Sequence, residues 1–208
     1  MICELDLCKH CNFKINTKAI SEIMALSFFI KNKAMSKQPK QFKPLNITIL
    51  VVSDSRTEAD DISGKTLVER LQEAGHHLTE KQIVADDTYQ IRAVVSQWIA
   101  DEAVNVIIST GGTGVTGRDG TPEAVTPLLD KTLDGFGEVF RMLSYQDIKT
   151  STIQSRAVAG VANATYIFCL PGSAGACRTA WDELIQAQLD FRTRPCNLVQ
   201  LMPRLLES

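Results

Sequence analysis

The sequence predicts an α/β domain of three layers, in which helices cover both faces of a mostly parallel central sheet. From residue 46 onward, apolar runs of strand length alternate with segments of helical periodicity, which is typical of parallel strands connected by helices. Residues 47–52 form a mostly β-branched apolar run, as expected of a strand buried on both faces. With 208 residues, 44% of them hydrophobic, the chain is long enough for one such domain with an appendage.

The first half of the domain contains two more predicted strands and two helices. We expect Ser63 to cap a helix that Gly75 ends, followed by a weaker strand over residues 77–84. Asp87 and Gln90 form a capping pair for a second helix with apolar residues at helical spacing. Residues 104–109 are expected to form the third strand.

The second half begins with a short helix, which Thr121 is expected to cap and Pro122 to begin, running to Leu129. Two further helices and two strands, joined by an Asn163-Ala164 turn, complete the prediction. The helices are expected around residues 136–145 and 181–189, and the strands over residues 157–161 and 166–170. Both tryptophans, Trp98 and Trp181, fall on apolar helical faces and should be buried.

The charge distribution separates the start of the chain from the rest. Residues 1–44 hold 8 Lys, no Arg and 3 acids, whereas residues 45–208 hold 14 basic and 21 acidic residues. We therefore expect residues 1–43 to be a leader, a tail or an extension created by an upstream start, because Met35 offers a second start. Residues 44–208 would form the domain, whose acidic balance argues against nucleic-acid binding.

No apolar run reaches the ~18 residues of a membrane-spanning helix. No cleavage site follows the apolar stretch of residues 20–30, so we expect a cytoplasmic protein without membrane association.

The cysteines and histidines give weaker signals. Cys3, Cys8 and Cys11 share the spacing of a plant-type ferredoxin and have His10 beside them, but a cluster would need a fourth thiolate. Fortuitous spacing is favoured, and a metal role stays open. The three later cysteines are expected to be buried thiols, and the two later histidines to form a solvated turn after a helix. These residues are Cys169, Cys177, Cys196, His76 and His77.

A glycine-rich segment, Thr110-Gly-Gly-Thr-Gly114, follows the third predicted strand directly. Gly112, Gly114 and Gly117 match the dinucleotide-binding fingerprint literally, yet three residues separate them from the next helix start, where that fingerprint needs the helix at once. The remaining interpretation is a concave loop whose backbone N–H groups bind a phosphate or another anion. An ordinary glycine-rich turn is the alternative.

Two acids and a second loop belong to the same edge of the sheet. Asp86 follows the second strand and Asp119 lies just past the third, so both should reach the carboxyl edge, where ligands bind in this class of fold. Two carboxylates beside an anion-binding loop suit a Mg²⁺-nucleotide. Asp86 is alternatively a second capping acid, and Asp119 a turn acid paired with Arg118. Residues 171–173 (Pro-Gly-Ser) form either a second ligand loop or a plain turn.

Several longer motifs resemble the molybdenum cofactor biosynthesis family of molybdopterin-binding and adenylylating proteins. They are Thr110-Gly-Gly-Thr-Gly114, the segment 118–124 with Arg118-Asp119 and Thr121-Pro122-Glu123, Gly135-Phe-Gly-Glu138 and Leu170-Pro-Gly-Ser173. Residues 140–144, 154–163 and 176–181 resemble its protein B branch more closely. The resemblance spans residues 45 to 197 and leaves residues 1–43 outside.

The resemblance implies a three-layer α/β/α fold assembled as a trimer or a dimer of trimers. It also implies Mg²⁺-dependent transfer of AMP from ATP to the terminal phosphate of molybdopterin, before a molybdenum insertion protein adds the metal. Asp86 and Asp119 would be the catalytic acids and the Mg²⁺ ligands. The implied substrate contacts are Thr110, Gly111, Gly112, Thr113, Gly114, Arg118, Thr121, Pro122, Glu123, Ser155, Arg156, Pro171, Gly172 and Ser173.

Two other functions stay open. Some protein-B-type members lack the acids, so the chain is alternatively a catalytically weak molybdopterin-binding or carrier protein of the same pathway. The fold also occurs as a nucleotide-processing domain elsewhere, and fold alone does not decide function.

Overall fold

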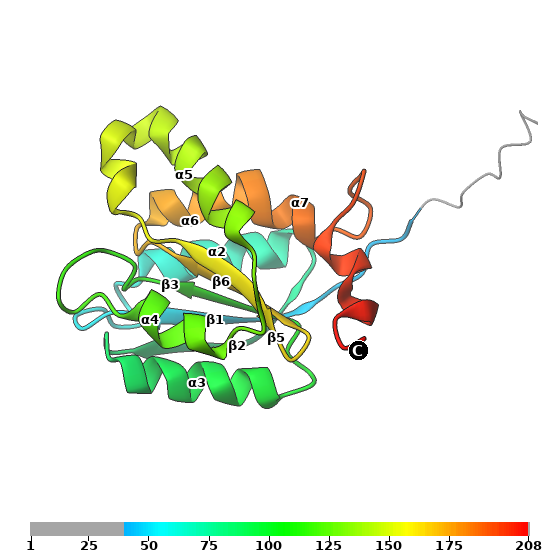
Figure 1. Cartoon of the computed structure of the whole chain (residues 1–208), viewed down its shortest axis with the longest axis horizontal. Helices are drawn as coiled ribbons and strands as arrows, with labels where there is room; N and C mark the ends of the chain where they lie inside the picture. Colours follow the sequence, from blue (N-terminus) through cyan, green and yellow to red (C-terminus); the bar gives the residue numbers. More distant parts are fainter. Residues whose placement is uncertain (1–39, 208) are drawn as a thin grey trace, which may run out of the picture. The chain divides into compact units, whose positions relative to one another are not determined.

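A six-stranded sheet forms the centre of the computed structural model, which describes residues 40–207 (Figure 1). The strands lie in the order β2-β1-β3-β6-β5-β4. The first four in this order run parallel, while β5 pairs antiparallel with both β6 and β4. Their bounds are β1 Asn46–Val52, β2 His77–Val84, β3 Val106–Thr110, β4 Lys131–Thr132, β5 Val158–Ala162 and β6 Thr165–Leu170.

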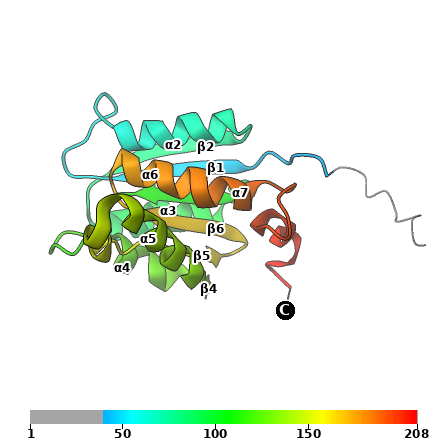
Figure 2. The same ribbon diagram turned by 90° about the horizontal axis from the view of Figure 1, so that it is seen from above.

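Helices cover both faces of this sheet, which confirms the predicted three-layer α/β/α fold (Figures 1 and 2). On one face lie α2 Ile62–Glu73, α5 Asp134–Ile148, α6 Ala174–Ala180 and α7 Gln186–Leu189. The π-helical turn η3 Trp181–Ile185 joins α6 to α7. On the other face lie α3 Thr88–Ala100 and α4 Thr121–Val125. Short 3₁₀ turns occupy η1 Thr126–Leu128, η2 Lys149–Gln154, η4 Leu198–Gln200 and η5 Met202–Arg204.

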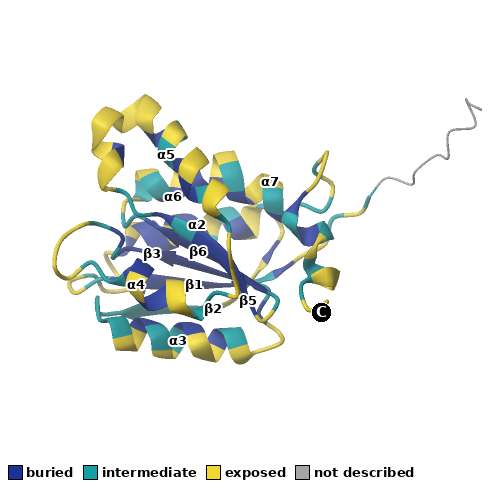
Figure 3. Cartoon of the chain, in the orientation of Figure 1, coloured by how far each residue is buried: buried dark blue, intermediate teal, exposed yellow. Residues whose placement is uncertain are grey.

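The alternation of side chains along β1 divides the core into two halves. Ile47, Ile49 and Val51 pack against α2, α5 and α6, whereas Leu50 and Val52 pack against α3 and α4. Because both faces of the sheet are covered, β1, β3 and β6 are largely apolar runs and are buried along nearly their whole length, whereas β2 at the edge of the sheet is at most partly buried (Figure 3). Trp98 and Trp181 are 2% and 1% exposed, as predicted.

The start of α2 differs from the prediction. Asp61, not Ser63, is its N-cap, because the extended backbone at Asp61 lets its carboxylate accept a hydrogen bond from the Gly64 N–H at 2.8 Å. Ser63 lies buried inside the first turn. At α3 the prediction is confirmed, since Asp87 accepts hydrogen bonds from the N–H groups of Tyr89 and Gln90.

The helix predicted from Pro122 to Leu129, with Thr121 as its cap, is shorter and differently capped. Gly120 occupies the N-cap position, and the Thr121 hydroxyl donates instead to the Gly111 carbonyl at 2.9 Å. The α-helix ends at Val125, because Pro127 has no N–H to continue the hydrogen-bond ladder. The third strand starts at Val106 rather than at residue 104.

Two further predictions on single residues are wrong. His76 is not solvated: it is 4% exposed, its Nδ1 accepts a hydrogen bond from the Leu45 N–H at 3.2 Å, and its ring contacts Phe42 and Trp181. Cys196 is exposed, whereas Cys169 and Cys177 are buried as expected. Sequence alone does not tell whether the turn after a helix folds back onto the core.

The predicted leader, residues 1–43, lies almost entirely outside the described residues, as do Cys3, Cys8 and Cys11. Within residues 40–207, no helix combines the length and the apolar character that crossing a bilayer requires.

Candidate functional site

A cavity of about 700 Å³ opens at the carboxyl ends of β1, β2, β3 and β6. The loops after these four strands form its floor and rim, and the carboxyl-terminal half of α5 with η2 contributes Ser144, Asp147 and Ser151. The edge is where the parallel topology predicts a ligand. The volume lies in the range of small-molecule sites.

The glycine loop after β3 requires its glycines. Gly111 and Gly112 have φ angles of 107° and 64°, in the left-handed region that glycine adopts without strain. A Cβ on Gly111 would lie 2.1 Å from the Val52 carbonyl oxygen, and one on Gly112 would lie 2.8 Å from Asp86 Oδ2. The backbone of this loop therefore lies directly against the Asp86 carboxylate.

Buried hydroxyl groups hold the loop from beneath. Thr110 donates to the Pro171 carbonyl at 3.0 Å and thereby joins the loops that follow β3 and β6. Thr121 holds the next part of the loop through its hydroxyl bond to Gly111 and its N–H bond to the Gly112 carbonyl. Thr110, Thr121 and Pro122 are buried, so they support the loop and do not line the cavity.

Asp86 lines the cavity beside the glycine loop. Its Oδ1 accepts a hydrogen bond from the Gly120 N–H at 3.2 Å. Burial raises the pKa of this carboxyl, and the negative charges of Asp119 and Asp54 raise it further, against the opposing effect of the Gly120 bond. A carboxylate so disfavoured would be stabilised by a bound cation.

Asp119 also lines the cavity, but it is held by its own turn. Its Oδ2 accepts hydrogen bonds from the Thr116 hydroxyl and, at 2.7 Å, from the Thr116 N–H. The Thr116 hydroxyl bond is the main reason that the pKa of Asp119 lies below its usual value. Asp119 is thus not paired with Arg118, which forms an ion pair with Asp54 at 2.7 Å.

Arg156 fastens the far side of the glycine loop. It donates to the carbonyls of Gly114 at 2.6 Å and Asp119 at 2.8 Å, and it pairs with Glu123. Its guanidinium group therefore binds the backbone around the cavity, and neither it nor Glu123 lines the cavity. The neighbouring Ser155 does line it, with a buried Oγ that has no hydrogen-bond partner among the described residues.

The structure thus brings most of the predicted site residues to one cavity. Asp86 and Asp119 lie there with the loop formed by Gly111, Gly112, Thr113 and Gly114. Ser155, Pro171, Gly172 and Ser173 line it as well. Six predicted residues lie around the cavity without lining it: Thr110, Arg118, Thr121, Pro122, Glu123 and Arg156.

Sequence reasoning missed the loop after β1. Asp54 and Arg56 line the cavity, and Asp54 accepts a hydrogen bond from the Asp86 N–H at 3.1 Å. The position of these residues after the first buried strand was the signal that would have pointed to them. No local signal points to Ser144 or Asp147, because only the tertiary packing of α5 brings them to the cavity.

The residues present fit a Mg²⁺ ion as part of a substrate complex. Among residues 40–207, no three His, Cys, Asp or Glu side chains are grouped closely enough to hold a metal by themselves. Mg²⁺ is commonly held by one or two carboxylates while phosphates and water supply the other ligands. Asp86 and Asp119 would supply these carboxylates, on either side of the glycine loop.

Fold and cavity together define the class: a three-layer α/β domain with a ligand-sized cavity at the carboxyl edge of its parallel strands. Residues 48–190 match the family model described as a probable molybdopterin binding domain. Molybdenum cofactor biosynthesis protein B of Escherichia coli (strain K12) is 58% identical over 163 residues, covering 78% of this chain and 96% of that protein.

Solved structures agree. A crystal structure of molybdenum cofactor biosynthesis protein B matches with a TM-score of 0.70 and 45% identity, covering 72% of this chain and 94% of that one. The tungsten cofactor synthesizing protein MoaB from Pyrococcus furiosus matches with a TM-score of 0.63 and 36% identity, covering 69% and 91%. The chain therefore belongs to the molybdenum cofactor biosynthesis protein B family of molybdopterin-binding domains. The resemblance seen in the motifs is confirmed.

Proposed function

We propose that this protein transfers AMP from Mg²⁺-bound ATP to the terminal phosphate of molybdopterin, the substrate to which its family membership in molybdenum cofactor biosynthesis points. One observation carries the proposal: Asp86 and Asp119 flank a glycine loop within a single cavity. That arrangement suits a nucleotide whose phosphates need both N–H donors and a cation.

The transfer breaks one P–O bond and forms another. A phosphate oxygen of molybdopterin attacks the α-phosphorus of ATP, the bond to the bridging oxygen between the α- and β-phosphorus breaks, and pyrophosphate leaves. Mg²⁺ would neutralise charge that develops on the phosphate oxygens. The contribution of the protein is to hold the two phosphates close and in line.

The glycine loop supplies donors for this purpose. The N–H groups of Gly112 and Thr113 donate to no acceptor within the described part of the chain. A phosphate at the loop would accept these hydrogen bonds. Because Thr110, Thr121 and Arg156 fix the loop from behind, its donors would already be in position when the substrate arrives.

A molybdopterin carrier of the same pathway is the second candidate function. It is favoured by the hydrogen bonds that Thr116 already donates to one oxygen of Asp119, because they leave that carboxylate fewer free lone pairs for a metal. A carrier would bind molybdopterin in the same cavity and consume no ATP.

The experiment that separates the two supplies the full chain with molybdopterin, Mg²⁺ and ATP labelled in the α-phosphate. Adenylyl transfer is expected to give labelled AMP-molybdopterin and an equal amount of pyrophosphate, and both should disappear when EDTA removes the metal. Retention of molybdopterin on the protein without either product would favour the carrier and contradict the proposal.

We further propose that the chain assembles as a homotrimer or a hexamer. Several apolar side chains of α5 and η2 are exposed in the single chain, which is typical of a surface covered by another copy. They are Val139, Met142, Tyr145, Ile148 and Ile153. Light scattering of the purified protein measures the assembly, and a monomer would contradict this proposal. The molybdenum insertion protein is the partner expected to receive the product.

A further inference from the structure

Arg56 is the one cationic residue that lines the cavity within residues 40–207. Four carboxylates line the same cavity: Asp54, Asp86, Asp119 and Asp147. An anionic substrate therefore enters surroundings of predominantly negative charge. A single guanidinium group has a large influence on where such a substrate can place its phosphates.

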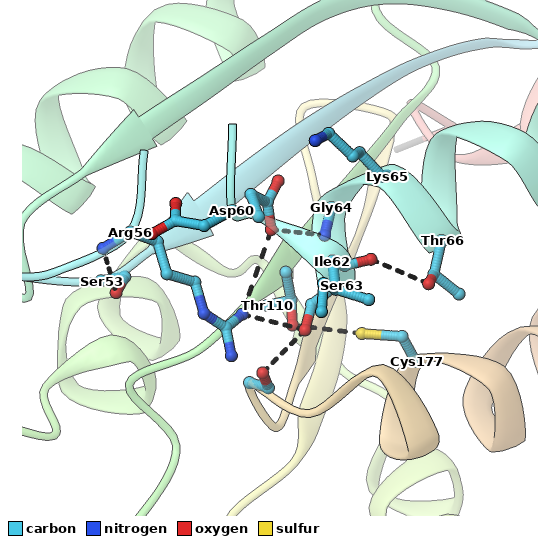
Figure 4. Close-up of polar contacts among 12 residues, drawn as sticks. Ser53, Arg56, Asp60, Ile62, Ser63, Gly64, Lys65, Thr66, Thr110 and Cys177 are labelled. Atoms are coloured by element: carbon cyan, nitrogen blue, oxygen red, sulfur yellow. Dashed lines mark hydrogen bonds and ion pairs between the residues drawn. The ribbon is translucent and has the colours of Figure 1, made fainter. Parts of the chain in front are cut away.

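Arg56 is fixed at one nitrogen and open at the others. Its Nη1 donates to Ser63 Oγ at 2.9 Å (Figure 4). Ser63 Oγ donates onward to the Gly172 carbonyl at 2.8 Å. Nε and Nη2 donate to no acceptor in the described part of the chain. The side chain is 34% exposed, so these donors remain accessible to a ligand.

The charge of Arg56 is not consumed by the buried acid nearest to it. Asp61 lies 4.0 Å from Nη1 but only 2.8 Å from Nζ of Lys81, which forms its closer ion pair. The carboxylate of Asp61 also accepts the Gly64 N–H at the start of α2. Lys81 is shared with Glu58, to which it lies 2.6 Å away, so Asp61 is balanced by Lys81 in part and by the helix cap. Arg56 approaches Asp61 only through Nη1, and its Nε and Nη2 stay available to other groups.

We infer that Arg56 is a substrate-binding residue that receives a phosphate group of the substrate through Nε and Nη2. A guanidinium group presents paired N–H donors that match two oxygens of one phosphate. The inference rests on the proposed function for the identity of the substrate. It adds a residue that the motifs did not predict, on the loop after β1 and next to the Pro171–Ser173 loop through the Ser63 contact.

Inorganic pyrophosphate is the probe that tests this inference without turnover. Isothermal titration calorimetry on the full chain with Mg²⁺ compares the unchanged protein with Arg56→Gln, Arg56→Lys and Arg178→Gln. Arg178 is a matched control, since it is an exposed arginine on α6 that does not line the cavity. Arg56→Gln is expected to raise the Kd for pyrophosphate by roughly tenfold or more, since one charge-assisted hydrogen-bonding group is lost. Arg56→Lys should lie between Arg56→Gln and the unchanged protein.

Two results would overturn the inference: unchanged protein that binds no pyrophosphate, or Arg56→Gln with the same Kd as both the unchanged protein and Arg178→Gln. Arg56→Lys keeps the charge near Asp61, so a weakened but folded lysine variant, with an unshifted melting temperature, separates lost binding from lost folding. Failure of the proposed function would look different. Pyrophosphate binding would still depend on Arg56, while labelled AMP would never reach molybdopterin.

Discussion

At the scale of single residues, Asp86 and Asp87 are neighbours with different surroundings. Asp87 accepts hydrogen bonds from two N–H groups at 3.0 and 2.9 Å and caps α3. Asp86 accepts one longer bond, at 3.2 Å, and lines the cavity. The sequence predicts the capping role of Asp87, because helix caps follow a local spacing rule. The position of Asp86 in the cavity was predicted from its place after a strand.

Substitution of each acid by alanine separates their roles. Asp87→Ala is expected to lower the free energy of unfolding by about 0.5–2 kcal/mol through loss of the cap, with AMP transfer largely kept. Asp86→Ala should keep stability and lose AMP transfer. Denaturant midpoints and turnover of both variants measure this, and the reverse pattern would mean that the wrong acid has been placed at the reaction.

His76 gives a prediction for the pH dependence of stability. Burial lowers the pKa of this histidine from 6.5 to about 4, and its Nδ1 must stay unprotonated to accept the Leu45 N–H. The unfolded chain therefore binds the proton first. The stabilisation that the neutral His76 ring contributes is complete above pH 6.5 and is lost as the pH falls from 6.5 to about 4. Below pH 4 the contribution of His76 changes no further.

The loss over this interval is expected to reach about 3 kcal/mol. His76→Gln keeps a hydrogen-bond acceptor but does not titrate, so its unfolding free energy should depend less on pH between 6.5 and 4. Equal pH slopes for the two proteins in urea titrations would show that His76 titrates normally.

At the scale of elements, the sheet was more predictable than the surroundings of the site. Three of the parallel strands, β1, β3 and β6, are largely apolar runs, and their burial on both faces produces that pattern directly. The fourth, β2, lies at the edge of the sheet, is at most partly buried and has a mixed sequence. β4 escaped prediction because Lys131 and Thr132 are exposed and join the sheet only by pairing with β5. The part of the cavity lining that α5 contributes was not predicted either, because only tertiary packing brings α5 to the cavity.

The glycine loop and α4 form one unit that Arg156 holds together. Arg156→Gln removes the donors that reach the Gly114 and Asp119 carbonyls. We expect exchange of the hydrogen-bonded backbone amides of Thr116, Asp119 and Gly120 to accelerate by roughly tenfold, because the loop opens more often, while amides in β1 and β3 exchange as before. Unchanged exchange of the loop would show that Thr110 and Thr121 suffice to hold it.

At the scale of the whole molecule, the sequence predicts a division between residues 1–43 and the domain that follows. The described core takes its residues from Leu45 to Val199, and the early segment differs from it in charge and periodicity. A chain that begins at Met35 is therefore expected to unfold within about 2 °C of the full chain. Differential scanning calorimetry measures this, and a drop of many degrees would show that residues 1–34 belong to the fold.

We propose that the two carboxylates beside the glycine loop support adenylyl transfer to molybdopterin by holding Mg²⁺. Single-turnover transfer of labelled AMP, measured side by side for the unchanged protein and Asp119→Asn, tests it most directly. We expect transfer by the unchanged protein, and a rate lower by on the order of a hundredfold for a fully folded Asp119→Asn, because a charged ligand for Mg²⁺ is lost. Equal rates in the two proteins, or no transfer by the unchanged protein, would contradict it.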